Sequence, residues 1–164
     1  MRNENLLFIG FMGCGKSSVA RALALDLKRV FFDSDDLIEL KFKLSIKKIF
    51  QEYGEDFFRQ EERLLANFFA KTSNAIIASG GGFYKNANLK EIGKIIYLEA
   101  GFDFLKNRLS KDELLKRPLF SDEKHARALF EERVDKYKSL AQQIINVENK
   151  SIETIKDEIK KGLI

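Results

Sequence analysis

The segment GFMGCGKS at positions 10–17 constrains this chain more than any other feature of its sequence. It matches the pattern G-x-x-x-x-G-K-[ST] at every fixed position, after an apolar run at 6–9 and before Val19, Leu23 and Leu27 at helical spacing. Glycines let the backbone curl so that its N–H groups converge on an anion, and the following helix adds its positive end. A plain glycine-rich turn is the alternative, but the strand before it and the helix after it favour a phosphate-binding loop.

The residues of this segment predict how a nucleoside triphosphate would be held. We expect Lys16 to reach the β- and γ-phosphates, the Ser17 hydroxyl to bind Mg²⁺ and Ser18 to contact the α-phosphate. The expected nucleotide-binding residues are Gly13, Cys14, Gly15, Lys16, Ser17 and Ser18. The pattern implies nucleotide binding and leaves open what receives the terminal phosphate.

Length, composition and charge exclude several other classes of protein. The chain has 164 residues, which fits a single domain over 1–164, and it contains one cysteine and one histidine. These counts rule out a disulfide framework and a thiolate zinc site, and they argue against a Ser-His-Asp triad. The net charge of +4 suits small anions better than nucleic acid. No apolar run approaches the roughly 20 residues of a membrane span, so we expect a cytoplasmic protein without nucleic-acid or membrane partners.

Short apolar runs alternate with longer stretches of helical periodicity along the whole chain. We expect five strands at 6–9, 30–32, 75–78, 94–98 and 144–147. They are rich in Ile, Val, Leu and Phe, as strands covered on both faces are. Alternating strands and helices predict a parallel sheet with helices on both sides. The expected fold is α/β: a P-loop NTPase-like three-layer fold with a five-stranded parallel sheet.

Two carboxylates follow the second expected strand. Asp33 and Asp35 are two residues apart, so in an extended segment they would project the same way, one near a metal ion and the other near an acceptor hydroxyl. The alternative is a cluster at a helix N-terminus, with Ser34 or Asp35 capping a helix that starts near Leu37. Spacing alone leaves both interpretations open, and capping and catalysis can coexist.

Two further segments carry groups that could bind a substrate. Arg59 lies three residues before Glu62 at the edge of an apolar helical arc, where its guanidinium either binds a carboxylate or forms a solvated ion pair. Three glycines at 80–82 follow the third strand. They either let the backbone approach a ligand closely or form a plain turn.

Basic residues near the end of the chain suggest a lid and a second arginine site. The segment KRPLF at 116–120 follows a polar stretch, which predicts a lid over approximately 109–123 whose Arg117 closes over the phosphates. A surface loop with incidental basic residues is the alternative. Arg133 lies one helical turn before Tyr137, where it either faces a ligand or pairs with neighbouring acids at the surface.

The order and spacing of these segments resemble the shikimate kinase family, the P-loop kinases of aromatic amino-acid biosynthesis, over about residues 6–162. The segments that carry the resemblance are GFMGCGKSS at 10–18, FFDSDDLIE at 31–39, GEDFFRQEE at 54–62, SGGG at 79–82, KRPLF at 116–120 and ERVDKY at 132–137. The resemblance implies a five-stranded parallel sheet, the co-substrate ATP with Mg²⁺, and a reaction that converts shikimate to 3-phosphoshikimate.

The resemblance also implies roles in metal binding and catalysis. Lys16 and the loop amides would hold ATP, and Ser17 would bind Mg²⁺, with Asp33 as the outer-sphere metal aspartate. Asp35 resembles the aspartate that contacts the shikimate hydroxyls, and it is the candidate base. Arg117 resembles the lid arginine that reaches the phosphates. The residues with implied catalytic roles are Lys16, Asp35 and Arg117.

For the substrate, the resemblance implies a carboxylate site and a backbone contact. Arg59 and Arg133 resemble the pair that grips the shikimate carboxylate, and Gly81 resembles the residue whose backbone contacts the substrate. With Asp35 they form the implied substrate-binding set. The implied partners are the small molecules ATP and shikimate, and we expect a monomer.

The adenine-contacting residues match the family least well. The family usually has an arginine close before the Arg-Pro-Leu segment, whereas here Arg108 lies nine residues before Arg117. Asn149 and Lys150, after the last strand, are further candidates.

Two other kinds of nucleotide-binding protein are considered as alternatives. Another small-molecule P-loop kinase, gluconate kinase-like or nucleotide kinase-like, would share the phosphate loop and the lid. A nucleotide acceptor would need a second arginine cluster and a slot for a base. A small GTPase would need an Asn-Lys-x-Asp motif, and the segment NKSI at 149–152 lacks the aspartate.

Overall fold

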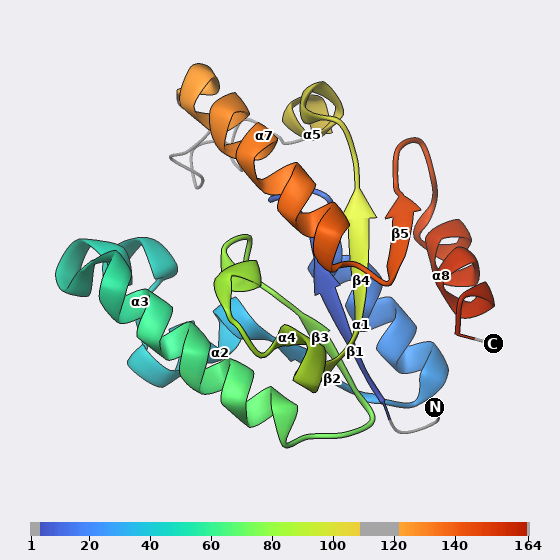
Figure 1. Cartoon of the computed structure of the whole chain (residues 1–164), viewed down its shortest axis with the longest axis horizontal. Coiled ribbons are helices and arrows are strands. Elements are labelled where there is room, and N and C mark those ends of the chain that lie inside the picture. Colours follow the sequence, from blue (N-terminus) through green and yellow to red (C-terminus); the bar gives the residue numbers. More distant parts are fainter. Residues whose placement is uncertain (1–3, 109–121, 164) are drawn as a thin grey trace.

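The central element of the protein is a five-stranded sheet with helices on both sides (Figure 1). The computed structural model describes residues 4–108 and 122–163. The strands are β1 (Asn5–Ile9), β2 (Val30–Asp33), β3 (Ala75–Ala78), β4 (Gly93–Glu99) and β5 (Gln143–Asn146). They lie in the order β2-β3-β1-β4-β5, and every neighbouring pair is parallel. The predicted α/β fold is confirmed, and the predicted strand bounds agree to within one residue.

Helices connect the strands and cover both faces of the sheet. They are α1 (Lys16–Leu27), α2 (Ser34–Phe42), α3 (Ile46–Ala70), the short 3₁₀ helix η1 (Phe83–Lys85), α4 (Leu89–Ile92), α5 (Phe102–Arg108), α7 (Glu123–Leu140) and α8 (Ile152–Lys161). Helices α1 and α8 lie together on one side of the sheet, and α3, α4 and α7 lie on the other (Figure 1). Helix α3 is kinked at Gly54, whose φ of 82° is not helical. None of the described helices is long and apolar enough to cross a membrane.

The core is centred on β1, the middle strand. Leu7 and Phe8 are fully buried, as are Ile76 on β3 and Ile96 on β4. Helices on both faces exclude water from these strands, which explains their nearly continuous apolar sequence. Burial of such side chains contributes roughly 1.5–3 kcal/mol each relative to exposure.

Phenylalanine rings join α3 to the sheet and so fix the helix that carries Arg59. The ring of Phe69 on α3 lies 5.7 Å from that of Phe32 on β2 and 6.2 Å from that of Phe83 on η1. Ring pairs at such separations add to the stabilisation that burial provides. Because all strands are parallel, the loops that follow β1, β2 and β3 meet at one edge of the sheet, where ligands of open α/β sheets bind.

Candidate active site

The loop between β1 and α1 has the curled backbone that its glycines predict. Gly13 and Gly15 have φ values of 85° and 89°, a left-handed conformation that side chains disfavour. A Cβ on Gly10 would lie 2.8 Å from the carbonyl oxygen of Leu98 and 2.9 Å from the sulfur of Cys14, so this position also excludes a side chain. The Cys14 side chain itself is buried in the core.

Lys16 lies across this loop at the first turn of α1. Its Nζ donates hydrogen bonds to the carbonyl oxygens of Gly10, at 2.8 Å, and Phe11, at 3.1 Å. The ammonium group is thus held beside the left-handed turn that precedes the helix. The loop places the Lys16 ammonium and the positive end of α1 at the same edge of the sheet.

Asp33 joins the end of β2 to both flanking helices. Its Oδ2 accepts a hydrogen bond of 2.5 Å from the Ser17 hydroxyl on α1. Its Oδ1 accepts from the backbone N–H groups of Asp35, at 3.0 Å, and Asp36, at 3.4 Å. Asp33 is therefore the N-cap of α2. The interpretation in which Ser34 or Asp35 caps a helix starting near residue 37 is wrong, because α2 already begins at Ser34.

Asp35 lies in the first turn of α2 and not in an extended segment. The prediction that Asp33 and Asp35 project alike from an extended chain is therefore wrong. The Asp35 carboxyl group packs against Gly80, where an added Cβ would be 2.5 Å from Oδ1. Burial, followed by the charges of Asp33 and Glu62, raises the pKa of Asp35 to about 7. Near neutral pH this group exchanges readily between its acid and base forms, as a proton acceptor requires.

Asp35→Asn is expected to stabilise the folded protein in a pH-dependent way. The folded state binds the Asp35 proton more tightly than the unfolded state, because the pKa rises from 3.8 to about 7 on folding. Stability is therefore lost as the pH rises through this interval, and the asparagine variant does not lose it. Urea unfolding across the interval should show a difference between the two proteins that grows with pH and levels off above about pH 7. A difference independent of pH would contradict this account.

Arg59 and Glu62 form an ion pair that is shielded from solvent on α3. Arg59 Nη1 donates to Glu62 Oε2 at 2.6 Å, and Nη2 donates to Glu55 Oε1 at 3.0 Å. The Arg59 side chain is 18% exposed and that of Glu62 only 1% exposed, so the alternative of a solvated pair is wrong. The Arg59 guanidinium lies directly against Gly82, where any added Cβ would overlap it. Burial raises the pKa of Glu62 although the positive charge of Arg59 opposes this.

Arg133 is buried on α7, with 7% of its surface exposed. The alternative of a surface ion pair is therefore wrong. Its Nη1 lies 3.0 Å from the position of a Cβ added to Gly81, and its guanidinium is 5.9 Å from the ring centres of Phe11 and Tyr84. One turn along the same helix, the Tyr137 hydroxyl donates to the carbonyl oxygen of Gly81 at 2.6 Å.

The three glycines at 80–82 each lie against a different charged group. Gly80 faces the Asp35 carboxyl group, Gly81 the Arg133 guanidinium and Gly82 the Arg59 guanidinium. An added Cβ would overlap the facing group at Gly80 and at Gly82 and would crowd it at Gly81. The glycine run is thus explained by close approach to charged side chains. The plain-turn interpretation holds in part, because the run also leads into the 3₁₀ helix η1.

Unsatisfied polar atoms concentrate at this place. Four buried side-chain N or O atoms in the described residues have no hydrogen-bond partner, and three of them are Asp35 Oδ1, Glu62 Oε1 and Arg133 Nε. Buried polar atoms are nearly always satisfied in folded proteins, so such a concentration is typical of a polar site that water or a ligand completes. The structure therefore brings together four predicted residues, namely Asp35, Arg59, Gly81 and Arg133.

Sequence reasoning missed several groups that shape this site. Ser34 is fully buried, and its hydroxyl accepts a hydrogen bond of 2.9 Å from the Gly80 amide. Gly80 and Gly82 also lie against charged side chains, whereas the family resemblance implies a role for Gly81 alone. Tyr137 enters the sequence analysis only as the residue one helical turn after Arg133, with no role of its own. The run of three glycines was the one available signal, since it implied close neighbours without naming them.

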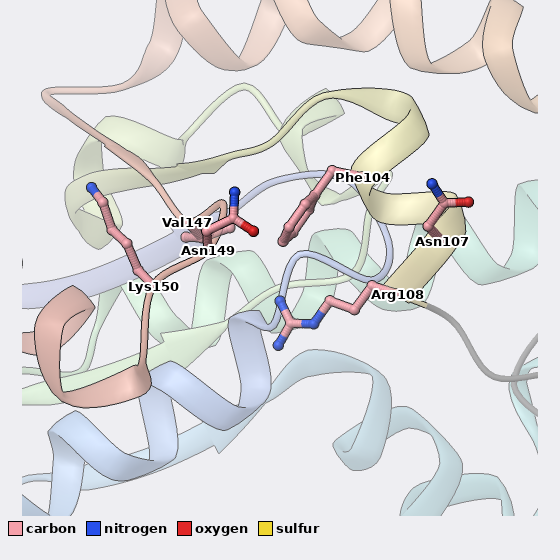
Figure 2. Close-up of a pocket in the computed structure, with 6 residues that line it drawn as sticks. All are labelled: Phe104, Asn107, Arg108, Val147, Asn149 and Lys150. Carbon is pink, nitrogen blue, oxygen red and sulfur yellow. The ribbon is translucent and has the colours of Figure 1, made fainter.

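A hollow lies beside the phosphate loop, away from the glycine run (Figure 2). This cavity has a volume of about 390 Å³. It is lined by Phe104, Asn107, Arg108, Val147, Asn149 and Lys150. The Arg108 side chain extends from α5 toward the loop, and its Nη2 lies 3.4 Å from the position of a Cβ on Gly15 (Figure 2). The three residues that the sequence offers as adenine contacts, Arg108, Asn149 and Lys150, thus line one cavity. Arg117 and most of the predicted lid at 109–123 lie outside the described residues.

Comparison with known proteins identifies the family of this chain. The family model described as shikimate kinase matches residues 12–163. A shikimate kinase of Helicobacter hepaticus is 39% identical over 151 residues, which cover 92% of this chain and 90% of the relative. A shikimate kinase of Francisella tularensis subsp. novicida is 36% identical over 172 residues, which cover 100% of this chain and 97% of the relative.

A solved structure gives the same result. The shikimate kinase from Acinetobacter baumannii in complex with shikimate has a TM-score of 0.88 and 30% sequence identity to this chain. The match covers 98% of this chain and 92% of that one. With a family model that spans nearly the whole sequence and full-length relatives above 30% identity, the conclusion is direct: this chain belongs to the shikimate kinase family.

Proposed function

We propose that this chain transfers the γ-phosphoryl group of ATP to the 3-hydroxyl of shikimate, giving ADP and 3-phosphoshikimate. The observation that carries the proposal is the glycine run at 80–82, which places one carboxyl group and two guanidinium groups around a single spot. Such a set suits a small acid that bears hydroxyl groups. Membership of the shikimate kinase family supports the same reaction.

Arg59 and Arg133 are the proposed binding groups for the substrate carboxylate. Both guanidinium groups are largely shielded from water, so a charge-assisted hydrogen bond to either is stronger than one at the surface. The unpartnered Nε of Arg133 is a free donor for such a contact within the described residues. The backbone of Gly81 lies between the two arginines, where it would contact the substrate ring.

Asp35 is the proposed group that orients the attacking hydroxyl and accepts its proton. Its Oδ1 has no partner among the described residues, and its pKa of about 7 lets it hold a proton near neutral pH. Phosphoryl transfer depends mainly on positioning and on charge stabilisation, so a strong base is not needed. The orientation of the hydroxyl toward the γ-phosphate is therefore the larger part of this role.

The nucleotide is proposed to lie along the loop at 10–18, with its base in the cavity of Figure 2. Amides of Gly13 to Ser18 and the Lys16 ammonium would bind the phosphates. Arg108 connects the cavity to the loop through its position beside Gly15. Arg117, in the predicted lid, is proposed to neutralise charge that develops on the transferred group.

Ser17 is proposed to bind Mg²⁺ directly, with Asp33 in the outer sphere of the ion. Their side-chain oxygens lie 2.5 Å apart, and hydroxyl and carboxylate oxygens are the donors that Mg²⁺ prefers. In the two described stretches no group of three or more His, Cys, Asp or Glu side chains is placed to hold a metal, which fits an ion bound mainly through phosphates and water. Bound Mg²⁺ would neutralise charge on the β- and γ-phosphates.

Two broader expectations follow from the proposed reaction. An ATP-dependent step of amino-acid biosynthesis is expected in the cytoplasm, where its co-substrate is available. The expectation that the enzyme acts as a monomer stays a prediction.

The rate should depend on pH through Asp35. Because the ionised carboxylate accepts the proton, kcat/KM for shikimate is expected to rise with pH and to reach a plateau above about pH 7. Initial rates measured between about pH 5.5 and 9 at low shikimate concentration test this. The residual activity of Asp35→Asn should lack the inflection, and an inflection that persists in this variant would assign it to another group.

The deciding experiment is an ADP-release assay with ATP and Mg²⁺ and four acceptors: shikimate, quinate, gluconate and AMP. Turnover confined to shikimate is expected. A preference for AMP or gluconate would overturn the proposed acceptor while leaving the nucleotide site in place. Comparable turnover of quinate would keep the class of carboxylated polyols but would contradict the assignment to shikimate alone.

A further inference from the structure

Tyr137 makes a contact that none of the roles proposed above uses. Its hydroxyl donates to the carbonyl oxygen of Gly81, 56 residues away in the sequence. The side chain is only 1% exposed, so this hydroxyl is shielded from bulk water. A buried phenol needs a hydrogen-bond partner, and here the partner is the main chain of the glycine run.

The anchored carbonyl belongs to the peptide group between Gly81 and Gly82. This peptide group is planar, so fixing its carbonyl oxygen also fixes the direction of its N–H group. Arg133 lies against Gly81 at one end of the plane, and Arg59 lies against Gly82 at the other end. Rotation of this one plane would therefore change how both guanidinium groups contact the loop.

Aromatic contacts hold the Tyr137 ring in place. The ring centre lies 5.3 Å from that of Tyr97 on β4 and 5.3 Å from that of Tyr84 on η1. Tyr137 also lies one turn from Arg133 on α7, and the Arg133 guanidinium is 5.9 Å from the Tyr84 ring centre. The same ring thus ties the helix that carries Arg133 to the sheet and, through its hydroxyl, to the glycine run.

We propose that Tyr137 is a positioning residue for substrate binding. It holds the peptide between Gly81 and Gly82, and with it the relative placement of Arg59 and Arg133, in the arrangement that binds the carboxylate of the acceptor. This inference rests on the proposed function. Tyr137 acts through the main chain and through Arg133, and it takes no part in proton or phosphoryl transfer.

Tyr137→Phe tests this role because it keeps the ring contacts and removes the hydrogen bond. The KM for shikimate is expected to rise about tenfold, as loss of one well-placed hydrogen bond would cause. The kcat should change by less than about twofold, because the contact is lost equally in the ground state and in the transition state. The KM for ATP should also change by less than about twofold, because Tyr137 contacts the glycine run and not the phosphate loop. Tyr97→Phe, which removes a hydroxyl from the same aromatic cluster, is the matched control and should keep wild-type values.

A second measurement follows the backbone amide resonances of the glycine run and does not depend on enzyme activity. The chain has ten glycines, so protein labelled with ¹⁵N-glycine gives a simple amide spectrum. In Tyr137→Phe the resonances of Gly81 and Gly82 are expected to shift, while that of Gly93, at the start of β4, should stay in place. The Tyr97→Phe spectrum should match the wild type at Gly81 and Gly82.

Two results would overturn the role of Tyr137. One is a wild-type KM for shikimate in Tyr137→Phe, and the other is an equal rise in the KM values for shikimate and ATP with unmoved Gly81 and Gly82 resonances. The proposed function is judged separately, on the wild-type enzyme. If the wild-type enzyme does not phosphorylate shikimate, the proposed reaction is wrong. If the wild-type enzyme is active and Tyr137→Phe has the same KM for shikimate, only the positioning role of Tyr137 is wrong.

Discussion

Asp35→Asn is expected to lower kcat for shikimate phosphorylation by about 10²–10⁴-fold, the usual contribution of a positioned general base. The asparagine keeps the shape of the side chain against Gly80 but accepts no proton at neutral pH. The KM for ATP should stay near the wild-type value, because Asp35 lies on α2 and not in the loop at 10–17. Steady-state kinetics with each substrate varied in turn measure both quantities.

Asp36→Asn is the matched control for this prediction. Asp36 occupies the same first turn of α2, but its carboxylate is exposed and lies 3.9 Å from the exposed Arg21. The same chemical change there should alter kcat by less than about twofold, because exposed pairs contribute little. If Asp35→Asn kept kcat within about tenfold of the wild type, Asp35 would be a substrate contact only and the proton would leave by another route.

Arg59→Ala is expected to raise the KM for shikimate strongly. Truncation of one partner in a buried, charged contact costs about 2–5 kcal/mol, which corresponds to a rise of roughly thirtyfold to more than a thousandfold. The KM for ATP should be unaffected. Arg63→Ala serves as the control, because Arg63 lies on the same helix with an exposed side chain.

The same substitution leaves Glu62 buried without its main cation. Removing one member of a buried pair destabilises a protein by about 3–5 kcal/mol, so the single variant will lose stability as well as affinity. The double variant with Arg59→Ala and Glu62→Gln removes the uncompensated charge and should recover much of that stability. Its KM for shikimate should remain high. A KM near the wild-type value in the stable double variant would remove Arg59 from the carboxylate site.

Local sequence was sufficient for the phosphate loop and for the strands. The loop at 10–17 works through its own backbone and the helix that follows it, so all its determinants are adjacent in the chain. Local apolar composition also predicts strands that are buried on both faces, which explains why β3 was predicted with its observed bounds. The cap of α2 was misassigned because Asp33, Ser34 and Asp35 are all good capping residues and composition does not rank them.

The sequence by itself therefore determined the α/β class, the nucleotide loop and a short set of candidate residues, because each depends on neighbours in the chain. Only the tertiary structure decided which candidates meet. Ser34 and Gly80 are 46 residues apart, and Tyr137 and Gly81 are 56 residues apart, yet each pair shares a hydrogen bond. The raised pKa of Asp35 likewise depends on burial against Gly80 and on the charge of Glu62. Burial and long-range contacts arise only when parallel strands bring distant loops to one edge of the sheet, so no local pattern could encode them.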